Sequence, residues 1–508
     1  MKNKKIINSA SLKQFLRKIR DNKKKSIVLC HGVFDILHVG HIKYLEAAKK
    51  KGDVLIVSLT TDKYVNKGFG RPYFNEQLRA KMLASLEVVD AVIFSNSYNA
   101  VKVINLVKPD IYAKGFEYKK IKNDITKNIS LEIKEVKKNN GKIVYVNEVV
   151  FSSSRIINTY GEVFNKKQFL YIENLKKKYG SSRILDYFNK TLNQKILVIG
   201  ESILDKYIYC NPLGKSGKEP YLAFLEERNE IYLGGALAVC RQLSEFSKNI
   251  SIISYLGDNK NYEKIINKNL PKNIKKYFLF KKNSPTILKT RYVDIVSGRK
   301  IFGSYLMNDN YLSKEKDLEF LSKIRKISEK VDHILIADYG HGLINKDAAK
   351  TISSLKKSIS INTQINASNI GYHNIRNYKN SQNIIINESE LRYEFRDRIS
   401  SLSELGKRLV KEMKAKNLVI TKGANGSVLI NNKKEIFECP AFTQNIVDKV
   451  GAGDTMLSLL AVCLDLNIPE DISIFFGNLI GSMSVKIIAN KEPVKFLDLY
   501  RTIEFAIK

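Results

Sequence analysis

Two series of alternating apolar and amphipathic segments, one in each half of the chain, most constrain how this protein folds. The first series occupies residues 26–150, and the second runs from residue 195 to the C-terminus. Short apolar runs that alternate with helical stretches are typical of parallel sheets buried between helices. A chain of 508 residues is also too long for one ordinary core. The pattern therefore predicts two α/β domains.

The first series predicts a Rossmann-like unit of five strands. Its apolar runs are residues 26–30, 53–59, 91–94, 111–113 and 142–146, with a helix expected over 41–51. The second series predicts strands at 195–200, 334–337, 384–386 and 418–421. Shorter alternating stretches between residues 207 and 230 predict a small β-lid on this larger domain.

A lysine-rich segment with helical period separates the two series and is interrupted only at residues 180–182. It contains no motif, so we interpret it as a connection. The predicted domains are residues 1–160, a helical connecting segment over 161–193, and residues 194–508.

The formal net charge of +35 first suggests nucleic acid, because Lys and Arg clusters neutralise backbone phosphates. Here the lysines are spread over both halves, and no helix-turn-helix or finger motif accompanies them. We therefore expect no nucleic-acid partner, and a positive field that concentrates anionic substrates such as ATP and sugar phosphates. Salt-sensitive DNA retention in a filter-binding assay would favour the alternative.

Cysteine usage and apolar runs indicate where the protein works. The five cysteines include no C-x-x-C pair, which argues against a zinc site and a disulfide framework. No apolar run approaches the ~20 residues of a membrane span. The N-terminal stretch lacks the apolar core and small-residue cleavage site of a secretion signal. We expect a cytoplasmic protein with no membrane partner.

Three of the six histidines lie between residues 31 and 41. His38 and His41 are separated by Val39 and Gly40, after a predicted strand and at the start of a predicted helix. Two imidazoles and the helix N-terminus then converge on one point, which suits a triphosphate, and Gly40 allows its close approach. Zinc ligation by the two histidines is the alternative, although no third ligand stands at a suitable spacing.

A second phosphate-handling pattern lies near the C-terminus, where Gly451, Ala452, Gly453 and Asp454 precede an apolar helical run over 456–464. The small residues let backbone N–H groups converge on a phosphoryl group at the helix N-terminus. Asp454 is placed to take a proton from a substrate hydroxyl, so we predict that it is a catalytic base.

Residues 24–158 resemble the cytidylyltransferase-like family of nucleotidyltransferases. The resemblance is carried by GVFDILHVGH at 32–41, GRP at 70–72, RAKML at 79–83, KPD at 108–110, KG at 114–115 and SSSRII at 152–157. It implies that a sugar 1-phosphate attacks the α-phosphorus of a triphosphate, with Mg²⁺ bridging the phosphates and His38 and His41 as catalytic residues. The implied nucleotide-binding residues are Val33, Phe34, Asp35, His38, Gly40, His41, Arg71, Lys114, Ser152, Ser153 and Ser154.

The choice of a sugar phosphate rests on one position. The branches of this family that activate glycerol phosphate or choline phosphate carry an arginine where this chain has Asn147. The loss of that arginine favours a sugar phosphate over a polyol or choline phosphate.

Residues 194–508 resemble the ribokinase or PfkB family of carbohydrate kinases. The matching motifs are GESILD at 200–205, GGA at 234–236, TILKTR at 286–291, DYGHG at 338–342, NESE at 387–390, TKGANG at 421–426 and DKVGAGD at 448–454. The resemblance implies sugar binding by Asp205, Gly234, Gly235, Arg291 and Asp454. It implies nucleotide and phosphate binding by Asn387, Glu390, Thr421, Gly423, Gly426, Gly451, Ala452 and Gly453. Mg²⁺ would be organised by Glu390 and not by a tight protein site.

The two parts together resemble the bifunctional enzymes of ADP-heptose synthesis, with the domain order reversed. That resemblance implies ATP-dependent phosphorylation of D-glycero-D-manno-heptose 7-phosphate and formation of ADP-heptose for lipopolysaccharide or another surface glycan. Ala238, His341 and Lys449 depart from the pattern of the heptose kinases. Two alternatives therefore stay open, a CTP-dependent enzyme for another sugar or polyol phosphate and a nucleotide-binding regulatory protein with one inactive domain. A homodimer is compatible with each interpretation.

Overall fold

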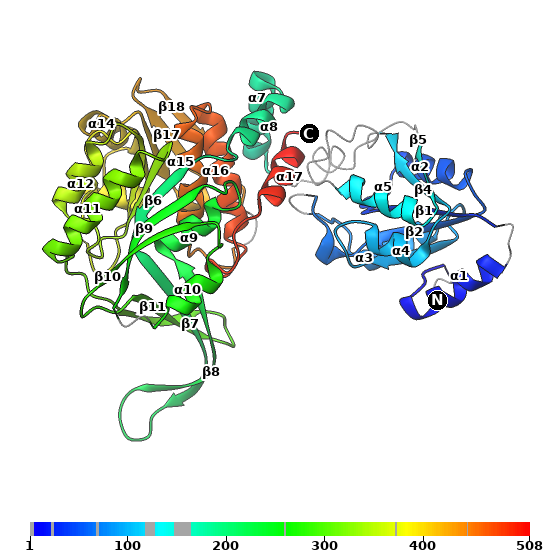
Figure 1. Cartoon of the computed structure of the whole chain (residues 1–508), viewed down its shortest axis with the longest axis horizontal. Coiled ribbons are helices and arrows are strands. Elements are labelled where there is room, and N and C mark those ends of the chain that lie inside the picture. The colour runs from blue at the N-terminus through cyan, green and yellow to red at the C-terminus, as the bar shows by residue number, and fades with distance from the viewer. Residues whose placement is uncertain are drawn as a thin grey trace. The chain divides into compact units, whose positions relative to one another are not determined.

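The structure is a computed structural model that describes residues 5–21, 25–67, 71–116, 128–146, 164–258, 261–370, 373–443 and 446–508. The chain divides into two compact units (Figure 1). The smaller comprises Met1–Asn165 with Arg501–Lys508, and the larger comprises Lys166–Tyr500. Both units are α/β, which confirms the predicted fold class.

The smaller unit is built on a parallel sheet with the strand order β3-β2-β1-β4-β5. Its strands are β1 (Ile27–Gly32), β2 (Val54–Thr60), β3 (Ala91–Ser95), β4 (Ile111–Gly115) and β5 (Lys142–Val146). The strand order reverses beside β1, so β1 and β4 form a topological switch point. In sheets of this kind a ligand binds outside the carboxyl ends of the strands at that point.

Helices cover both faces of this sheet because side chains alternate along each strand. Ile27 and Leu29 of β1 face α1 (Ser9–Asp21), α4 (Val101–Val107) and α5 (Asn128–Lys138). Val28 and Cys30 face α2 (Val39–Lys49) and α3 (Glu76–Ala84). The five predicted strands are all present, and the helix predicted from residue 41 begins at Val39 because His38 caps it.

The larger unit opens with α7 (Lys166–Tyr179) and α8 (Ser181–Lys190), which meet at Gly180. Its main sheet has the strand order β10-β9-β6-β13-β14-β15-β16-β17-β18. These strands are β6 (Ile196–Gly200), β9 (Ile250–Gly257), β10 (Lys275–Lys281), β13 (His333–Asp338), β14 (Ser358–Thr363), β15 (Asn383–Asn387), β16 (Asn417–Thr421), β17 (Ser427–Asn431) and β18 (Ile436–Cys439). Only β6, β13, β15 and β16 were among the predicted strands.

Two groups of helices cover the main sheet, one on each face (Figure 1). One face carries α9 (Gly235–Leu243), α15 (Ala452–Asp465) and α16 (Glu470–Ser484). The other carries α11 (Lys314–Ser328), α12 (Lys346–Ser353), α13 (Glu388–Phe395) and α14 (Leu402–Met413). Beyond residue 260 the described chain also contains the α-helices α10 (Glu263–Asn269) and α17 (Phe496–Ala506).

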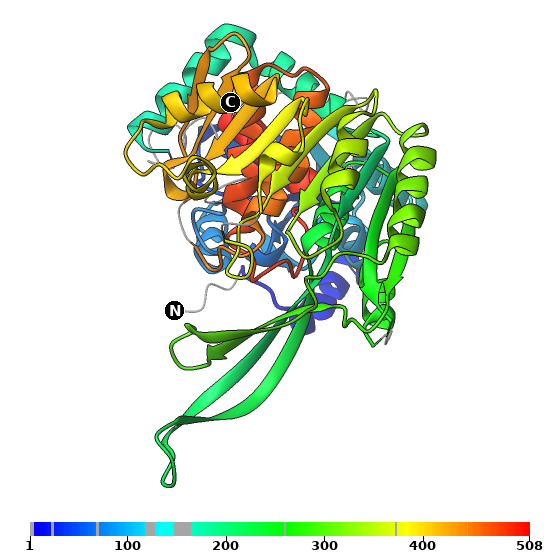
Figure 2. The same ribbon diagram turned by 90° about the vertical axis from the view of Figure 1, so that its left-hand side faces the viewer.

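A separate four-stranded sheet confirms the predicted lid and extends it. Its strand order is β12-β11-β7-β8, with β7 (Ser202–Lys215), β8 (Leu222–Gly234), β11 (Ile287–Asp294) and β12 (Lys300–Leu306). The β7–β8 hairpin projects from the unit as a long arm (Figures 1 and 2). β12 was not predicted as a strand. Every residue of β12 is exposed, so no buried face marks it in the sequence.

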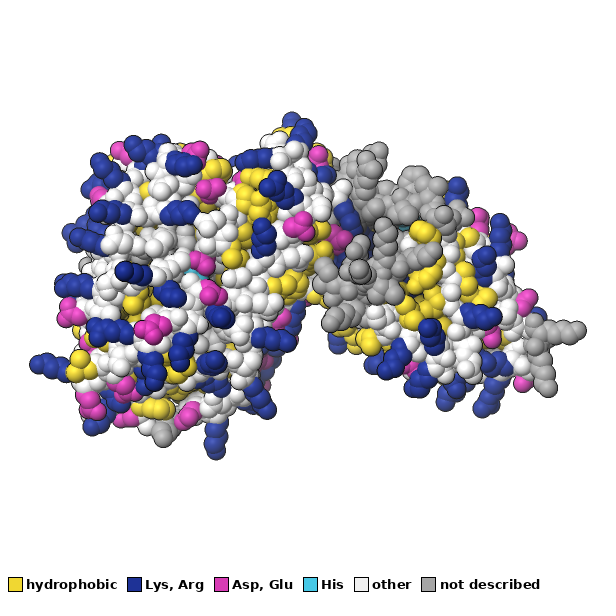
Figure 3. Space-filling model, turned by 45° about the horizontal axis from the view of Figure 1, so that its top comes forward, with side chains coloured by type: hydrophobic (Ala, Val, Ile, Leu, Met, Phe, Trp, Pro, Cys, Tyr) yellow, Lys and Arg dark blue, Asp and Glu magenta, His cyan; other side chains and the backbone are white. Residues whose placement is uncertain are grey.

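Three expectations from composition concern the interior and the surface. All five cysteines are buried and carry free thiols. Across the described segments, no helix combines the length and apolarity that a bilayer crossing requires. On the face shown in Figure 3, Lys and Arg side chains are distributed over both units and interspersed with Asp and Glu.

Candidate active sites

His38 and His41 come together at the start of α2, beside the switch point of the smaller sheet. His38 is the N-cap residue, and its Nδ1 accepts the backbone N–H of Gly40 at 3.1 Å. Since Nδ1 accepts, the neutral ring carries its proton on Nε2. The two imidazoles stack with their centroids 4.0 Å apart. Both rings can therefore act as neutral hydrogen-bond donors at one point.

The surroundings of His41 favour an anion. Burial, followed by the nearby His38 and then by Lys67 and Arg71, lowers the pKa of His41 to about 3. Burial also lowers the pKa of His38. His41 Nδ1 is buried and has no hydrogen-bond partner within the described part of the chain. A buried ring nitrogen without a partner, close to cations and a helix N-terminus, can donate to a phosphate oxygen when it carries the ring proton.

The loop before α2 is held by a buried arginine that was not among the predicted site residues. Phe34 and Ile36 have φ angles of 46° and 53°, a left-handed region that costs a non-glycine residue about 1 kcal/mol or more. Arg79 of α3 is 0% exposed and donates to the Val33 carbonyl at 2.5 Å. It also donates to the Thr60 carbonyl at 3.0 Å, which ties the loop to the end of β2.

Asp35 and Arg71 bind each other, with Arg71 Nε 2.5 Å from Asp35 Oδ2. The same carboxylate accepts the backbone N–H of Tyr73 at 2.8 Å and that of Phe74 at 3.1 Å. Asp35 therefore fixes the turn after residue 70 beside the two histidines. Direct contact of Asp35 or Arg71 with a nucleotide stays a prediction. The predicted phosphate ligands Ser152, Ser153 and Ser154 lie outside the described residues.

Lys114 lies at the end of β4 and forms a buried ion pair. Its Nζ is 2.9 Å from Glu132 Oε2 of α5, with 10% and 4% of the two side chains exposed. Glu132 also accepts the Tyr112 hydroxyl and the Ala100 backbone N–H, both at 2.9 Å. The ammonium is thus engaged inside the fold, and its predicted contact with a nucleotide is untested.

Replacing Lys114 with alanine should lower the free energy of unfolding by about 3–5 kcal/mol, because the Glu132 carboxylate would stay buried without its cation. The measurement is the urea midpoint of the full chain. Lys138→Ala is the matched control, since its ion pair with Glu135 leaves the lysine 73% exposed and exposed pairs contribute at most about 1 kcal/mol. Equal midpoints for the two variants would contradict this prediction.

The predicted sugar-binding residues of the larger unit meet where the lid joins the main sheet. Asp205 of β7 forms a buried ion pair with Arg291 of β11. A Cβ added at Gly234 would lie 2.3 Å from Asp205 Oδ2, so a larger residue here would displace the Asp205 carboxylate. Gly235 follows as the first residue of α9.

Lys289 of β11 is a further cation at this place. It pairs with Asp205 in the strand register and is buried. Burial lowers the pKa of its ammonium, while Asp205 and then Glu201 and Asp454 act in the opposite direction. The motif that contains Lys289 was recognised in the sequence, but Lys289 itself was not among the predicted binding residues.

Asp454 lies in the first turn of α15. Gly451 caps this helix with a φ of 86°, and a Cβ there would lie 1.9 Å from Asn490 Oδ1. Apart from the neighbouring residues and the backbone of α15 itself, no heavy atom of the described chain lies within 4 Å of a Cβ placed on Gly453, so the helix N-terminus beside Ala452 is open. Burial and the nearby Asp205 raise the pKa of Asp454 to about 7, although Tyr339 and Lys289 lower it. A carboxylate of this kind suits a general base at neutral pH.

The predicted nucleotide-side residues gather at the ends of β15 and β16. Asn387 pairs with Thr421 in the strand register, and Gly423 and Gly426 follow Thr421 in the next turn. Asn387 and Glu390 form a capping box on α13, in which Glu390 Oε2 accepts the Asn387 backbone N–H at 2.9 Å. Burial raises the pKa of Glu390 to about 7.

The Glu390 carboxylate fits a hydrated magnesium ion. Its other oxygen accepts the Ile365 backbone N–H at 3.3 Å, so each oxygen keeps one lone pair. Mg²⁺ usually retains several waters, and those lone pairs can accept from them. Within the described ranges, no three His, Cys, Asp or Glu side chains gather as metal ligands.

Two departures from the heptose kinase pattern lie inside the fold. Ala238 is buried in α9. His341 is also buried, and its Nδ1 lies 3.0 Å from Asp309 Oδ1. The sequence did not indicate that the residue after Gly340 would be an interior side chain.

The family of carbohydrate kinases described as pfkB matches residues 193–491, which is more than half of the chain. The chain belongs to the pfkB family of carbohydrate kinases. Residues 29–185 of this pfkB member match a second family, described as cytidylyltransferase-like. The two matches confirm the predicted order of a cytidylyltransferase-like part followed by a part from the pfkB family of carbohydrate kinases.

Curated relatives resemble the N-terminal region of this pfkB member. A protein named bifunctional protein HldE from Methylobacillus flagellatus is 49% identical over 94 residues, which are 18% of this chain and 19% of the relative. Proteins of the same name from Aliarcobacter butzleri and Campylobacter jejuni are 46% and 48% identical over 123 and 118 residues. These two matches cover 24% and 23% of this chain, and 26% and 25% of the relatives. The match thus spans about a quarter of those relatives or less.

Solved structures resemble the larger unit of the pfkB member. Phosphofructokinase-2 from Escherichia coli in complex with potassium has a TM-score of 0.51 at 13% identity, over 62% of this chain and 100% of that one. The same enzyme with substrates and products gives 0.50 at 14% identity, with equal coverage. At this identity the likeness shows the fold alone, and it confirms the predicted kinase-like architecture.

Proposed function

We propose that the protein is a bifunctional sugar-activating enzyme. The kinase site phosphorylates a sugar or sugar phosphate with ATP, and D-glycero-D-manno-heptose 7-phosphate is the leading acceptor. The nucleotidyltransferase site joins a sugar 1-phosphate to a nucleotide, with ADP-heptose and pyrophosphate as the leading products. The observation that carries the proposal is the position of Asp454, in the first turn of α15 with its pKa raised to about 7.

In the kinase reaction, Asp454 takes the proton of the acceptor hydroxyl. The hydroxyl oxygen then bonds to the γ-phosphorus of ATP, and the bond from that phosphorus to ADP breaks. Backbone N–H groups at the start of α15 face the transferred phosphoryl group, since Gly453 leaves this end open. Lys289, which is buried beside Asp205, suits an acceptor that already carries a phosphate.

In the nucleotidyl transfer, a sugar 1-phosphate oxygen attacks the α-phosphorus and pyrophosphate leaves. His38 and His41 donate hydrogen bonds to the phosphates as negative charge shifts toward the leaving group. The stacked rings and the unpartnered Nδ1 of His41 among the described residues support this role. No covalent intermediate is needed.

Both families act on nucleoside triphosphates, generally with Mg²⁺. Bound Mg²⁺ would neutralise phosphate charge, and Glu390 would orient its water ligands in the kinase site. The relatives' name, bifunctional protein, supports two activities in one chain. The use of ATP and not CTP, the homodimer, the cytoplasmic location and the supply of a surface glycan stay predictions.

The direct test is to incubate the purified protein with ATP or CTP and a panel of sugar phosphates, followed by ³¹P NMR. We expect ADP with a new sugar phosphate resonance, and pyrophosphate with a nucleotide-sugar. Turnover in one reaction alone would favour a regulatory protein with one inactive domain. Turnover with CTP alone in the second reaction would favour the alternative substrate class.

The proposed domain boundaries make a further prediction. A fragment of residues 1–160 should fold and bind ATP alone, because its sheet and both helical layers come from within that range. Circular dichroism and calorimetric titration with ATP measure the two properties. An insoluble fragment, or a folded one that does not bind the nucleotide, would show that the site needs residues beyond 160.

A further inference from the structure

Tyr339 lies next to the proposed base of the kinase site. It follows β13 directly, at the carboxyl end of the strand, and is 2% exposed. Its hydroxyl donates to Asp454 Oδ1 at 2.7 Å. The bond joins two residues that are separated by 115 positions in the sequence. Tyr339 was not among the predicted site residues.

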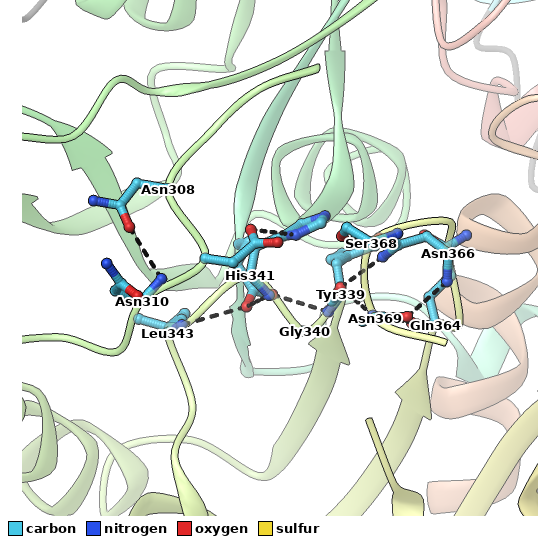
Figure 4. Close-up of polar contacts among 12 residues, drawn as sticks. Asn308, Asn310, Tyr339, Gly340, His341, Leu343, Gln364, Asn366, Ser368 and Asn369 are labelled. Atoms are coloured by element: carbon cyan, nitrogen blue, oxygen red, sulfur yellow. Dashed lines mark hydrogen bonds and ion pairs between the residues drawn. The ribbon is translucent and has the colours of Figure 1, made fainter. Parts of the chain in front are cut away.

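The backbone of the turn that carries Tyr339 is held from one side by Glu201, a buried carboxylate just after β6. Glu201 Oε2 accepts the Tyr339 N–H at 2.9 Å, and Oε1 accepts the His341 N–H at 3.0 Å. Oε1 also accepts the Leu343 N–H at 3.4 Å (Figure 4). One carboxylate thus accepts the backbone N–H groups of every second residue along this turn, at positions 339, 341 and 343.

Two asparagines hold the same turn from the other side. Asn366 Nδ2 and Asn369 Nδ2 each donate to the Tyr339 carbonyl at 2.9 Å, and Asn369 also donates to the Gln364 carbonyl at 3.0 Å (Figure 4). Both backbone polar groups of Tyr339 are therefore fixed by side chains from other segments. A residue whose main chain is fixed on both sides presents its side chain in one position.

We propose that Tyr339 is a positioning residue of the kinase site, which orients Asp454 so that Oδ2 faces the acceptor hydroxyl. This inference rests on the proposed role of Asp454 as the base. Tyr339 does not exchange its own proton in the reaction, because burial and the nearby Asp454 raise its pKa well above 10. It acts only as a hydrogen-bond donor.

The hydrogen bond from Tyr339 should also influence the pH at which Asp454 is ionised and can act as a base. Besides Tyr339, the groups that face Asp454 are Asp205 of β7, Lys289 of β11 and Glu390 of α13. Burial and Asp205 raise the pKa of Asp454, whereas Tyr339 and Lys289 lower it. Loss of the Tyr339 hydroxyl should raise that pKa further, by about one unit. Because only ionised Asp454 accepts a proton, the acid limb of kcat should move to higher pH.

The test is Tyr339→Phe in the full chain, assayed from pH 5.5 to 9 with ATP and D-glycero-D-manno-heptose 7-phosphate. We expect kcat at pH 7 to fall about 10- to 100-fold, with less than about a threefold change in KM for the sugar. The acid limb should move up by about one pH unit. Tyr378→Phe is the matched control, because Tyr378 is equally buried but donates to Asp338 and not to Asp454. Its acid limb should stay in place.

A second measurement needs no acceptor. The titration of Asp454 can be followed by ¹³C NMR of carboxyl-labelled aspartate and assigned by the resonance that Asp454→Asn removes. A higher pKa of Asp454 in Tyr339→Phe than in the wild type supports the inference, and an unchanged pKa overturns it. Full kinase turnover by Asp454→Asn would instead overturn the proposed function, and the ¹³C titration would still decide whether the bond exists.

Discussion

Asp454→Asn is expected to reduce kinase turnover by about 10²- to 10⁴-fold, the usual loss when a positioned general base is removed. An amide of the same shape can still accept the Tyr339 hydroxyl, but it cannot take the proton of the acceptor. Nucleotidyl transfer should stay close to the wild-type rate, because His38 and His41 lie in the other compact unit. Both activities are measured on the same sample by ³¹P NMR.

Asp347→Asn is a suitable control for Asp454→Asn. Asp347 is also an acidic residue in the first turn of a helix, α12, but its side chain is 80% exposed. Asp347→Asn makes the same change of carboxylate to amide, but away from the kinase site. The variant should therefore retain both kinase and nucleotidyl transfer activity. Wild-type kinase turnover in Asp454→Asn would show that Asp454 is not the general base.

His38→Ala and His41→Ala should each reduce nucleotidyl transfer much more than they weaken triphosphate binding. Negative charge grows on the departing pyrophosphate in the transition state, so donors aimed at it contribute more there than in the ground state. Loss of a single donor of this kind costs about 10²- to 10³-fold in turnover. Single-turnover rates and calorimetric ATP affinities of both variants measure the two effects.

His38 also caps α2, so its alanine variant should lose about 1 kcal/mol of helix stability as well. His38→Asn separates the two effects, because asparagine is a good N-cap residue but carries no imidazole. We expect the asparagine variant to fold like the wild type and to remain slow. Full activity in His38→Asn would show that His38 acts only as the N-cap residue of α2.

Zinc binding by the two histidines predicts different results. The wild type would contain stoichiometric zinc by elemental analysis, and both alanine variants would lose it together with folded structure. A loss of ATP affinity as large as the loss of turnover would also contradict a role in the transition state.

Local sequence was sufficient to predict the strands of the smaller sheet and to place the two turns that we propose bind phosphate. Buried strands such as β2 are continuous apolar runs, and this pattern is visible without knowledge of their neighbours. His38 and Gly451 stand at helix starts, where a cap residue and the first turn are set by residues within a few positions. The family motifs are local for the same reason.

The residues that hold these sites in place were decided by the tertiary structure. Glu201 and Tyr339 are 138 positions apart, and Arg79 reaches back 46 positions to Val33. No periodicity or spacing in the sequence links such pairs, because the distance between the two side chains depends on the spatial order of the strands in the sheet. β12 escaped prediction because all of its residues are exposed and because, among the described strands, it pairs with β11 alone, at the edge of the sheet. The sequence by itself determined where the two proposed phosphate-binding turns lie, and the packing of distant strand ends decided how Asp454 and the β1–α2 loop are positioned there.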